Sequence, residues 1–252
     1  DKNNFNVLLL TSNENIKEII KQTNFFKVKN LIISNKKKFL IIKKLFKKKK
    51  INIFNNFDSI DDIFKGRNID YTMSAISSFY GLEPTLKIIK YSKTIAIANK
   101  ESIICGWSLI QKELKKHKSY FLPIDSEHFS IYSLINKSTK ENIEKVFITA
   151  SGGPFINYPI NKFKSITPQE ALKHPNWNMG KKISIDSATM MNKVFEIIEA
   201  KKIFNLKYTK LEMIIHTQSY IHALVKFSSG ITKILIHDTN MTIPIFNSLY
   251  PK

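Results

Sequence analysis

The stretch that decides the fold is residues 71–98, YTMSAISSFYGLEPTLKIIKYSKTIAIA. It opens with a β-branched, apolar run at 71–76, continues through a helix-prone segment from Pro84 to Tyr91, and closes on a second apolar run at 94–98. Two strand-like runs joined by a helix are what a parallel strand pair with a right-handed crossover requires. This stretch therefore predicts a strand–helix–strand unit of a parallel sheet.

The same alternation extends toward the start of the chain. Three more strand-like runs precede residue 71, and helix-prone stretches separate them. The strand runs are VLLL (7–10), LIIS (31–34) and INIF (51–54). The first expected helix begins at Asn15, the second runs through Lys44, and the third lies near Ile60 to Phe64. We therefore expect an α/β fold with a doubly wound, mostly parallel nucleotide-binding sheet over residues 1–120.

The pattern changes after Glu101, where strands and helices no longer alternate regularly. The expected elements are a helix to about Lys116, strands at FLPI (121–124) and VFITA (146–150), a helix from Ala188 to Phe204, and strands at MIIH (213–216), ALVKF (223–227) and TKILI (232–236). The last three runs come at hairpin-like spacing, with a turn at 228–230 between the final pair. This predicts an α+β catalytic domain over residues 121–252, with a cleft where the two domains meet.

Composition bounds the class of protein. With 252 residues, 43% of them hydrophobic, the chain can bury a large core. The single cysteine, Cys105, cannot form an internal disulfide, which favours a reduced, intracellular setting. No apolar run reaches the roughly 20 residues that span a bilayer, and the first residues lack a signal-peptide pattern, so we expect no membrane partner.

The net charge raises nucleic acid as a candidate partner. Forty Lys and Arg against twenty Asp and Glu give +20, which attracts polyanions. The excess is mostly lysine, however, and Arg67 is the only arginine, although arginine is the usual reader of bases and phosphates. The lysine clusters at 36–38 and 47–50 are interpreted as solvated helix faces. We expect no nucleic-acid partner and keep a basic nucleic-acid-binding protein as the alternative.

Asp125, Ser126 and Glu127 follow a predicted strand, where two carboxylates can turn toward one point in a cleft. Oxygen-only ligands suit Mg²⁺ or Mn²⁺, and such sites normally need a third carboxylate, for which Glu196 is the candidate. The alternative is that Asp125 or Ser126 simply caps the helix that begins near Glu127. On pattern alone the cap is favoured.

The stretch from Asp186 to Glu196 places polar groups on a largely apolar helix. Asn192 and Glu196 lie one turn apart on the same face, with Lys193 adjacent. Ser187, expected at the start of this helix, would offer a hydroxyl where helix amides attract anions, so a phosphate would suit that end. The alternative is an ordinary N-cap at Ser187 and an exposed lysine.

Four shorter segments are further candidates. Ser151 and the paired glycines after it allow close backbone approach to a ligand, and residues 174–180 combine rigid, bulky and flexible residues as a closing loop does. Residues 13–15 and 99–101 follow predicted strands, where α/β sheets bind ligands. Each segment can equally be a turn, a packed loop or a helix cap.

These separate signals combine into one resemblance. The blocks are IANKESIICG (97–106), LPIDSEH (122–128), TASGGPF (149–155), HPNWNMGKKISIDSATMMNK (174–193), EIIEA (196–200) and HTQSYIH (216–222). In this order they resemble the 1-deoxy-D-xylulose 5-phosphate reductoisomerase family, from about Tyr71 to the end of the chain. The resemblance implies an NADP-dependent oxidoreductase that rearranges and reduces 1-deoxy-D-xylulose 5-phosphate to 2-C-methyl-D-erythritol 4-phosphate in the non-mevalonate isoprenoid pathway.

The resemblance also implies residue roles. Asp125, Glu127 and Glu196 would bind Mn²⁺ or Mg²⁺, with Co²⁺ a further candidate, and would be catalytic together with Lys100 and His174. The substrate, a phosphorylated sugar, would contact Lys100, Ser126, Glu127, Ser151, His174, Trp177, Ser187, Asn192, Lys193 and Glu196. NADPH would contact Asn99, Glu101, Met179 and Gly180 at its nicotinamide, and Asn13, Glu14 and Asn15 at its adenosine phosphate.

The sequence also departs from the family pattern. The family begins with a strand and a glycine-rich G-S-T-G-S-I-G turn and ends with a helical domain, and neither is recognisable here. We therefore expect a fragment of a longer protein that binds NADPH weakly or not at all by itself. Glu14 would repel a 2′-phosphate unless it turns away. The resemblance further implies a homodimer and a location in the bacterial cytoplasm or a plastid-type organelle, and an inactive relic is the alternative within the family.

Overall fold

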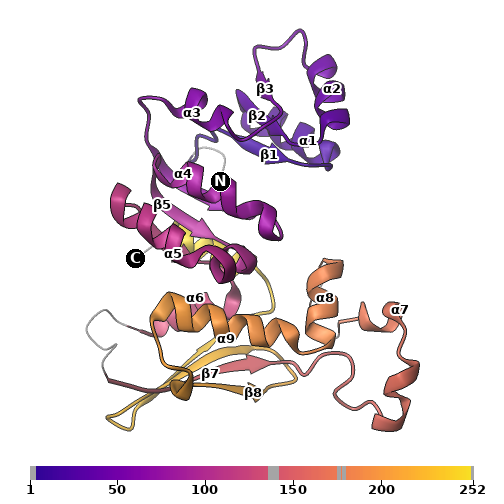
Figure 1. Cartoon of the computed structure of the whole chain (residues 1–252), viewed down its shortest axis with the longest axis vertical. Helices are drawn as coiled ribbons and strands as arrows, with labels where there is room; N and C mark the ends of the chain where they lie inside the picture. Colours follow the sequence, from indigo (N-terminus) through magenta and orange to yellow (C-terminus); the bar gives the residue numbers. More distant parts are fainter. Residues whose placement is uncertain (1–3, 136–141, 175–176, 178–179, 251–252) are drawn as a thin grey trace. The chain divides into compact units, whose positions relative to one another are not determined.

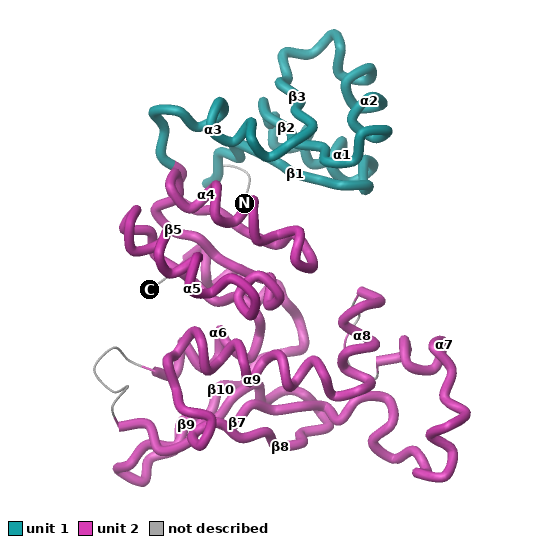
Figure 2. The backbone as a smooth tube through the Cα atoms, in the orientation of Figure 1, with its two compact units in different colours: residues 1–68 teal, residues 69–252 magenta. Residues whose placement is uncertain are grey.

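The structure is a computed structural model, which describes residues 4–135, 142–174, 177 and 180–250 (Figure 1). The chain divides into two compact units, Asp1–Asn68 and Ile69–Lys252 (Figure 2). Each unit is described by itself. The predicted division at residue 120 is a different one, because it separates a cofactor domain from a catalytic domain, and it stays a prediction.

The first unit is a small parallel sheet with helices between its strands. The strands are β1 (Leu10–Ser12), β2 (Asn30–Ile33) and β3 (Asn52–Phe54), in that order, and the helices are α1 (Ile16–Phe26), α2 (Lys36–Leu45) and α3 (Ser59–Phe64). Leu31, Ile33 and Ile42 are fully buried in its core. The first strand begins later than predicted, because pairing with β2 starts only at Leu10, while Val7 packs against the core without a place in the ladder.

The second unit opens with the predicted strand–helix–strand arrangement. Its first sheet contains β4 (Ile69–Ser74), β5 (Ser92–Ile97) and β6 (Tyr120–Pro123), all parallel and in that order, joined through η1 (Phe79–Gly81), α4 (Leu82–Ile89) and α5 (Lys100–His117). Where α4 meets α5, a Cβ on Gly106 would lie 2.4 Å from the Leu82 side chain, so the glycine permits this close packing. The predicted α/β class with parallel sheets is confirmed.

A second, mixed sheet follows. Its strands are β7 (Ile143–Ala150), β8 (Leu211–Ile215), β9 (Ile221–Phe227) and β10 (Thr232–Ile236), in the order β10-β9-β7-β8. The predicted hairpin between β9 and β10 is confirmed, with Gly230 at φ +85° in its turn. The hairpin-like reading of β8 and β9 is wrong. β7 lies between them and pairs in parallel with β8, because the chain from β7 to β8 is a long crossover through a helix.

Helices α6 (Ser126–Leu134) and α9 (Met191–Phe204) lie over one face of this mixed sheet (Figure 1). Ile131 of α6 and Ala200 of α9 are fully buried against Val146, Ile148 and Val225 of the strands. This packing holds α6 and α9 next to each other, and both helices carry candidate site residues.

The remaining helices are short. They are η3 (Ile160–Ser165), α7 (Pro168–Ala171), α8 (Lys181–Ala188), η4 (Tyr208–Lys210) and α10 (Thr242–Leu249). The prediction of one helix from Ala188 to Phe204 is wrong at its beginning. Met190 adopts a left-handed conformation at φ +60°, which ends the preceding turn and makes α9 a separate helix from Met191. Among the described residues, no helix is both long and apolar enough to cross a membrane.

The core of the mixed sheet generates a stability prediction. Replacing the fully buried Ile148 by Ala should lower the free energy of unfolding by about 2–5 kcal/mol, because the lost side chain leaves a cavity between the sheet and its helices. Urea denaturation followed by circular dichroism measures this change. Ile160→Ala is the control, since its side chain is 85% exposed, and equal effects of the two substitutions would contradict the assignment of Ile148 to the core.

Candidate functional site

Strand order brings two of the candidate side chains together. Lys100 is the first residue of α5 and follows β5, whereas Asp125 precedes α6 and follows β6. Because β5 and β6 are neighbours in a parallel sheet, their carboxyl ends lie at the same edge. The Lys100 ammonium accordingly lies 2.8 Å from Asp125 Oδ2. Glu196, in the second turn of α9, reaches the same point from the neighbouring helix, 3.2 Å from Lys100 Nζ.

The three predicted carboxylates converge. Asp125, Glu127 and Glu196 each offer one oxygen, and these oxygens lie within 4.8 Å of one another. Around Mg²⁺ or Mn²⁺, ligand distances of about 2.1 Å put opposite oxygens about 4.2 Å apart. Small side-chain rotations would close the triad onto such an ion, and an all-oxygen ligand set suits a hard cation. The residues present therefore fit a divalent metal.

The geometry of Asp125 shows the helix cap and is compatible with the metal interpretation. Its side chain accepts a hydrogen bond from the backbone N–H of Ser126 at 3.0 Å, so Asp125 caps α6, as the alternative interpretation predicts. Its second oxygen faces Lys100 and belongs to the carboxylate triad. This hydrogen bond fixes the orientation of the Asp125 carboxylate, which the proposed metal site requires.

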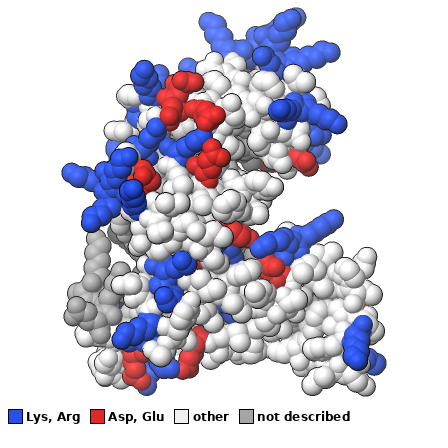
Figure 3. Space-filling view, in the orientation of Figure 1, with Lys and Arg blue, Asp and Glu red and all other residues white. Residues whose placement is uncertain are grey.

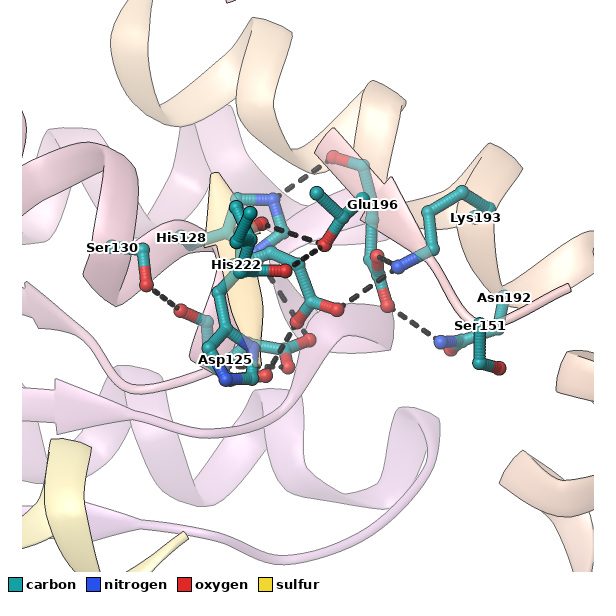
Figure 4. A network of polar contacts seen from close by, with 12 residues as sticks. Asp125, His128, Ser130, Ser151, Asn192, Lys193, Glu196 and His222 are labelled. Carbon is teal, nitrogen blue, oxygen red and sulfur yellow. Dashed lines mark hydrogen bonds and ion pairs between the residues drawn. The ribbon is translucent and has the colours of Figure 1, made fainter. Parts of the chain in front are cut away.

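Two buried lysines neutralise part of the carboxylate charge. Lys100 Nζ donates to Asn192 Oδ1 at 2.9 Å as well as pairing with Asp125 and Glu196. Lys193 Nζ lies 2.9 Å from Glu127 Oε1 and also pairs with Glu196. Figure 4 shows Lys193 and Asn192 pointing toward Glu196 from the same helix, as the predicted polar stripe requires. The alternative of an exposed Lys193 is wrong, because its side chain is buried.

Burial and neighbouring charges separate the pKa values of the carboxyl groups. Burial raises the pKa of Glu196 to about 7, and the Glu127 carboxylate adds to this rise, whereas Lys193 and Lys100 act in the opposite direction. Burial also acts to raise the pKa of Glu127, but Lys193, the Ser126 hydroxyl and Lys100 together hold that pKa well below its ordinary value. Burial acts to lower the pKa of Lys100, which its carboxylate neighbours nevertheless raise well above the usual value. Three carboxyl groups in this cluster share two ammonium groups.

A histidine and a further carboxylate lie behind the triad, and the sequence reasoning missed both. His128 is fully buried, and its Nε2–H donates to the backbone carbonyl of Glu196 at 2.9 Å. His128 Nδ1 lies 3.3 Å from Glu199 Oε2, and burial raises the pKa of Glu199 to about 7. The available signal was spacing, since His128 directly follows Glu127 and Glu199 follows Glu196 by one helical turn.

Beside the carboxylates is a cavity of about 320 Å³. Its walls include every predicted substrate-contacting residue, namely Lys100, Ser126, Glu127, Ser151, His174, Trp177, Ser187, Asn192, Lys193 and Glu196. Ser151 Oγ lies 3.2 Å from His174 Nε2 and accepts a hydrogen bond from the backbone N–H of Gly153. Gly153, at φ +70°, brings the loop so close to α8 that a Cβ would lie 2.9 Å from the Ser187 carbonyl oxygen. Gly153 therefore allows the loop at 151–153 and helix α8, which both line the cavity, to pack closely together.

The predicted place of Ser187 at the start of a helix is wrong. Ser187 lies in the last turn of α8, and the left-handed Met190 separates it from α9. Neither the anion-binding helix start nor the N-cap applies to it, because α9 begins only at Met191. Ser187 nevertheless lines the cavity.

The predicted cofactor residues are mostly held by local contacts. Asn99 caps α5 by accepting from the Ser102 N–H at 2.8 Å, and Glu101 pairs with Lys182 at 2.5 Å. Gly180 is exposed and belongs to the cavity wall, whereas Met179 lies outside the described residues. In the first unit, Asn13 accepts from the Ser34 hydroxyl, Glu14 is exposed and Asn15 caps α1. Their cofactor roles stay predictions.

His222, Ser219, Met190 and Met241 also contribute to the cavity and were not predicted as site residues. His222 is almost fully buried at the start of β9. Alternation along β9 gave no signal for it, because the pairing of β9 with β10 shifts between Ala223 and Ile221 and skips His222.

Two family models match the chain. 1-Deoxy-D-xylulose 5-phosphate reductoisomerase matches residues 1–106, and the C-terminal domain of the same family matches residues 121–204. A protein of that name from Pelagibacter ubique is 64% identical over 251 residues, which are 99% of this chain and 65% of that protein. One from Clostridium tetani is 37% identical over 254 residues, covering all of this chain and 66% of that protein. The chain thus spans about two thirds of the length of these relatives.

Solved structures show the same similarity. A DOX-P reductoisomerase in complex with NADPH, fosmidomycin and magnesium superposes with a TM-score of 0.92 at 32% identity, over 99% of this chain and 64% of that one. The 1-deoxy-D-xylulose 5-phosphate reductoisomerase from Zymomonas mobilis in complex with NADPH gives a TM-score of 0.89 at 33% identity, over all of this chain and 65% of that one. An aspartate dehydrogenase from Thermotoga maritima shares the fold alone, at 15% identity and a TM-score of 0.54.

The carboxylate triad generates a metal-binding prediction. Mn²⁺ should raise the melting temperature of the protein, since a ligand at 100 times its Kd stabilises the folded state by about 2.7 kcal/mol. Glu196→Gln keeps the side-chain size but removes one charge, and it should weaken Mn²⁺ binding by about tenfold or more. Calorimetric titration and thermal denaturation measure the two effects.

Glu212→Gln is the matched control for this measurement. Glu212 is an exposed carboxylate on β8, paired with Lys145, and its loss should leave Mn²⁺ binding unchanged. Full Mn²⁺ stabilisation in Glu196→Gln would contradict the metal assignment.

Proposed function

The chain belongs to the 1-deoxy-D-xylulose 5-phosphate reductoisomerase family, and from that membership we propose that its protein converts 1-deoxy-D-xylulose 5-phosphate to 2-C-methyl-D-erythritol 4-phosphate. The reaction uses NADPH and a divalent cation and belongs to non-mevalonate isoprenoid biosynthesis. The observation that carries the proposal is the convergence of Asp125, Glu127 and Glu196 beside a cavity lined by hydroxyl, amide and ammonium groups. NADPH and magnesium in the similar structures support the cofactor assignments.

Asp125, Glu127 and Glu196 hold the cation in this proposal, with Mg²⁺, Mn²⁺ and Co²⁺ as candidates. When bound, the cation supplies Lewis acidity that polarises the carbonyl and hydroxyl oxygens of the substrate while a carbon–carbon bond breaks and reforms. Lys100, which reaches both Asp125 and Glu196, orients the two carboxylates and offers an N–H donor to the substrate backbone. The Ser126 hydroxyl donates to Glu127 Oε2 at 2.6 Å and fixes that carboxylate in turn.

The phosphate of the substrate binds around Lys193 in this proposal. Lys193 supplies the positive charge, and Asn192, Ser151 and Ser187 supply hydrogen-bond donors around it. Lys193 also pairs with Glu127, so the phosphate anchor and the metal carboxylates share one ammonium group. Binding energy from the phosphate is thereby available to position the reacting carbons.

The segment at 174–180 closes over the substrate. Burial lowers the pKa of His174, and the Lys193 ammonium lowers it further, so His174 is neutral at pH 7 and can exchange hydrogen bonds with Ser151. Trp177 covers the cavity and excludes water, which protects the aldehyde that forms before reduction. NADPH supplies the hydride, with Asn99, Glu101, Met179 and Gly180 at its nicotinamide and residues 13–15 at its adenosine phosphate.

Nucleic-acid binding, which the surplus of lysine suggested, is a weaker proposal than the reductoisomerase function. Figure 3 shows the Lys and Arg side chains of the visible face in several separate groups, with Asp and Glu among them. A phosphate-tracking surface would need a continuous basic stripe. The bacterial relatives support a location in the cytoplasm, and a plastid location has no comparable support.

A second copy of the chain is the proposed protein partner. Phe147 and Leu224 are opposite each other in the mixed sheet, and Ile234 is opposite Leu224, so all three share the face away from α6 and α9. Ile234 is 48% exposed, and the lateral ion pairs Lys145–Glu212 and Lys226–Glu144 surround this apolar row. An apolar sheet face rimmed by charges is typical of an interface between copies.

The catalytic proposal predicts the outcome of one substitution. In the full-length parent, Glu196→Gln should reduce NADPH oxidation in the presence of 1-deoxy-D-xylulose 5-phosphate and Mn²⁺ to background, because the triad loses a charge without changing its shape. Glu212→Gln should retain the parental rate. Activity in Glu196→Gln would refute the metal role, and an inactive parent would favour the inactive relic.

The dimer proposal predicts a change of oligomeric state. Ile234→Glu should convert the full-length parent from a dimer to a monomer, since it buries an unpaired carboxylate in the apolar row. Light scattering coupled to size-exclusion chromatography measures the mass. Ile231→Glu is the control, because Ile231 is exposed in the turn that precedes β10. A dimer that survives Ile234→Glu would contradict the proposed face.

A further inference from the structure

His222 and His237 form a stacked pair next to the cavity. Their ring centroids are 3.7 Å apart and their planes differ by 17°. Trp177 meets the His222 ring edge-on, with centroids 6.0 Å apart. We call Trp177, His222 and His237 the aromatic stack. His222 and Trp177 belong to the cavity wall, whereas His237 does not and contacts the cavity only through the His222 ring.

Hydrogen bonding assigns the tautomer of His222. Its Nε2 lies 3.1 Å from the backbone carbonyl oxygen of His237, and a carbonyl only accepts, so Nε2 carries the proton. Burial lowers the pKa of His222, which outweighs the opposing effect of Glu127, so the ring is neutral at pH 7. In a neutral ring with Nε2 protonated, Nδ1 carries the lone pair.

His237 is itself held firmly after β10. Its backbone N–H donates to the Tyr220 carbonyl at 3.0 Å, and its Nδ1–H donates to the Asp238 carbonyl at 2.7 Å. Rotation of the His222 ring would therefore break the bond to the His237 carbonyl and separate two stacked rings. Within the described part of the chain, neither histidine belongs to a group that could hold a metal.

We infer that His237 is a positioning residue for the proposed reaction: its ring and its carbonyl fix the plane and the tautomer of His222, so that Nδ1 accepts a hydrogen bond from a substrate hydroxyl in the cavity. A residue that touches the substrate contributes most when its orientation is set before the substrate arrives. The His222 ring is set by a neighbour that does not itself belong to the cavity wall. This inference rests on the proposed function of the site.

Two substitutions in the full-length parent separate the parts of this device. His237→Ala removes the stacked ring but keeps the backbone carbonyl, and it should lower kcat about tenfold while changing KM less than about threefold, because the ring acts on orientation rather than on binding. His237→Phe keeps a flat ring and should restore at least half of the parental kcat. His117→Ala, at a partly buried histidine in the last turn of α5 that does not belong to the cavity wall, is the control and should have no effect. Parental kcat in His237→Ala, or equal losses in the Ala and Phe variants, would overturn the inference.

Nitrogen-15 NMR of histidine-labelled protein provides a readout independent of turnover. In the parent, the His222 shifts should report a protonated Nε2 and an unprotonated Nδ1, and in His237→Ala they should move toward the average of two exchanging tautomers. Unchanged His222 shifts in a folded His237→Ala would overturn the inference. If the parent shows no reductoisomerase activity, the proposed function fails, whereas the NMR result still decides whether His237 orders His222.

Discussion

The charge balance around Glu196 is the constraint on which the site depends. Four carboxyl groups, those of Asp125, Glu127, Glu196 and Glu199, lie near only two ammonium groups, those of Lys100 and Lys193. Removing charges from water costs several kcal/mol per ion unless partners replace the lost hydration. Burial is the main cause of the raised pKa values of Glu196 and Glu199, and neighbouring carboxylates add to it. A divalent cation would supply positive charge there, so the same surplus of carboxyl groups that costs stability suits the proposed metal site.

The fold places these charges through ordinary local structure. Parallel pairing of β5 with β6 sets Lys100 beside Asp125, and packing of α6 and α9 on one sheet sets Glu127 beside Lys193. Asn99 and Asp125 cap the two helices that start at this edge. Capping and metal binding are thus compatible uses of Asp125, because a carboxylate has two oxygens and the cap occupies one side of it.

The sequence was informative where a local rule decides the structure. Alternating apolar and polar stretches predicted the parallel strands. The D-x-E at 125–127 taken alone favoured a helix cap, and the family resemblance implied the triad with Glu196, whose members the fold brings together from two distant segments. Strand order in the mixed sheet could not be predicted, because β7 enters between β8 and β9 by tertiary packing that no turn residue specifies. The left-handed Met190 was also missed, since a non-glycine residue there is set by its surroundings rather than by its own preference.

The buried polar residues were the hardest to predict. His128 lies near the start of α6 and His222 near the start of β9. A single sequence does not distinguish a buried histidine at such a position from an exposed one, although both are buried here. Their partners are backbone carbonyls of Glu196 and His237, which come from remote parts of the second unit. Every residue has a backbone carbonyl, so the amino-acid type of the partner does not reveal such a hydrogen bond.

The most direct test of the central claim is an anomalous difference map from crystals of the full-length parent soaked with Mn²⁺. The account predicts one strong peak about 2.1–2.2 Å from an oxygen of each of Asp125, Glu127 and Glu196, with Lys193 turned away from Glu196. A peak at other residues, or no peak while Lys100 and Lys193 keep their pairs with the three carboxylates, would contradict it.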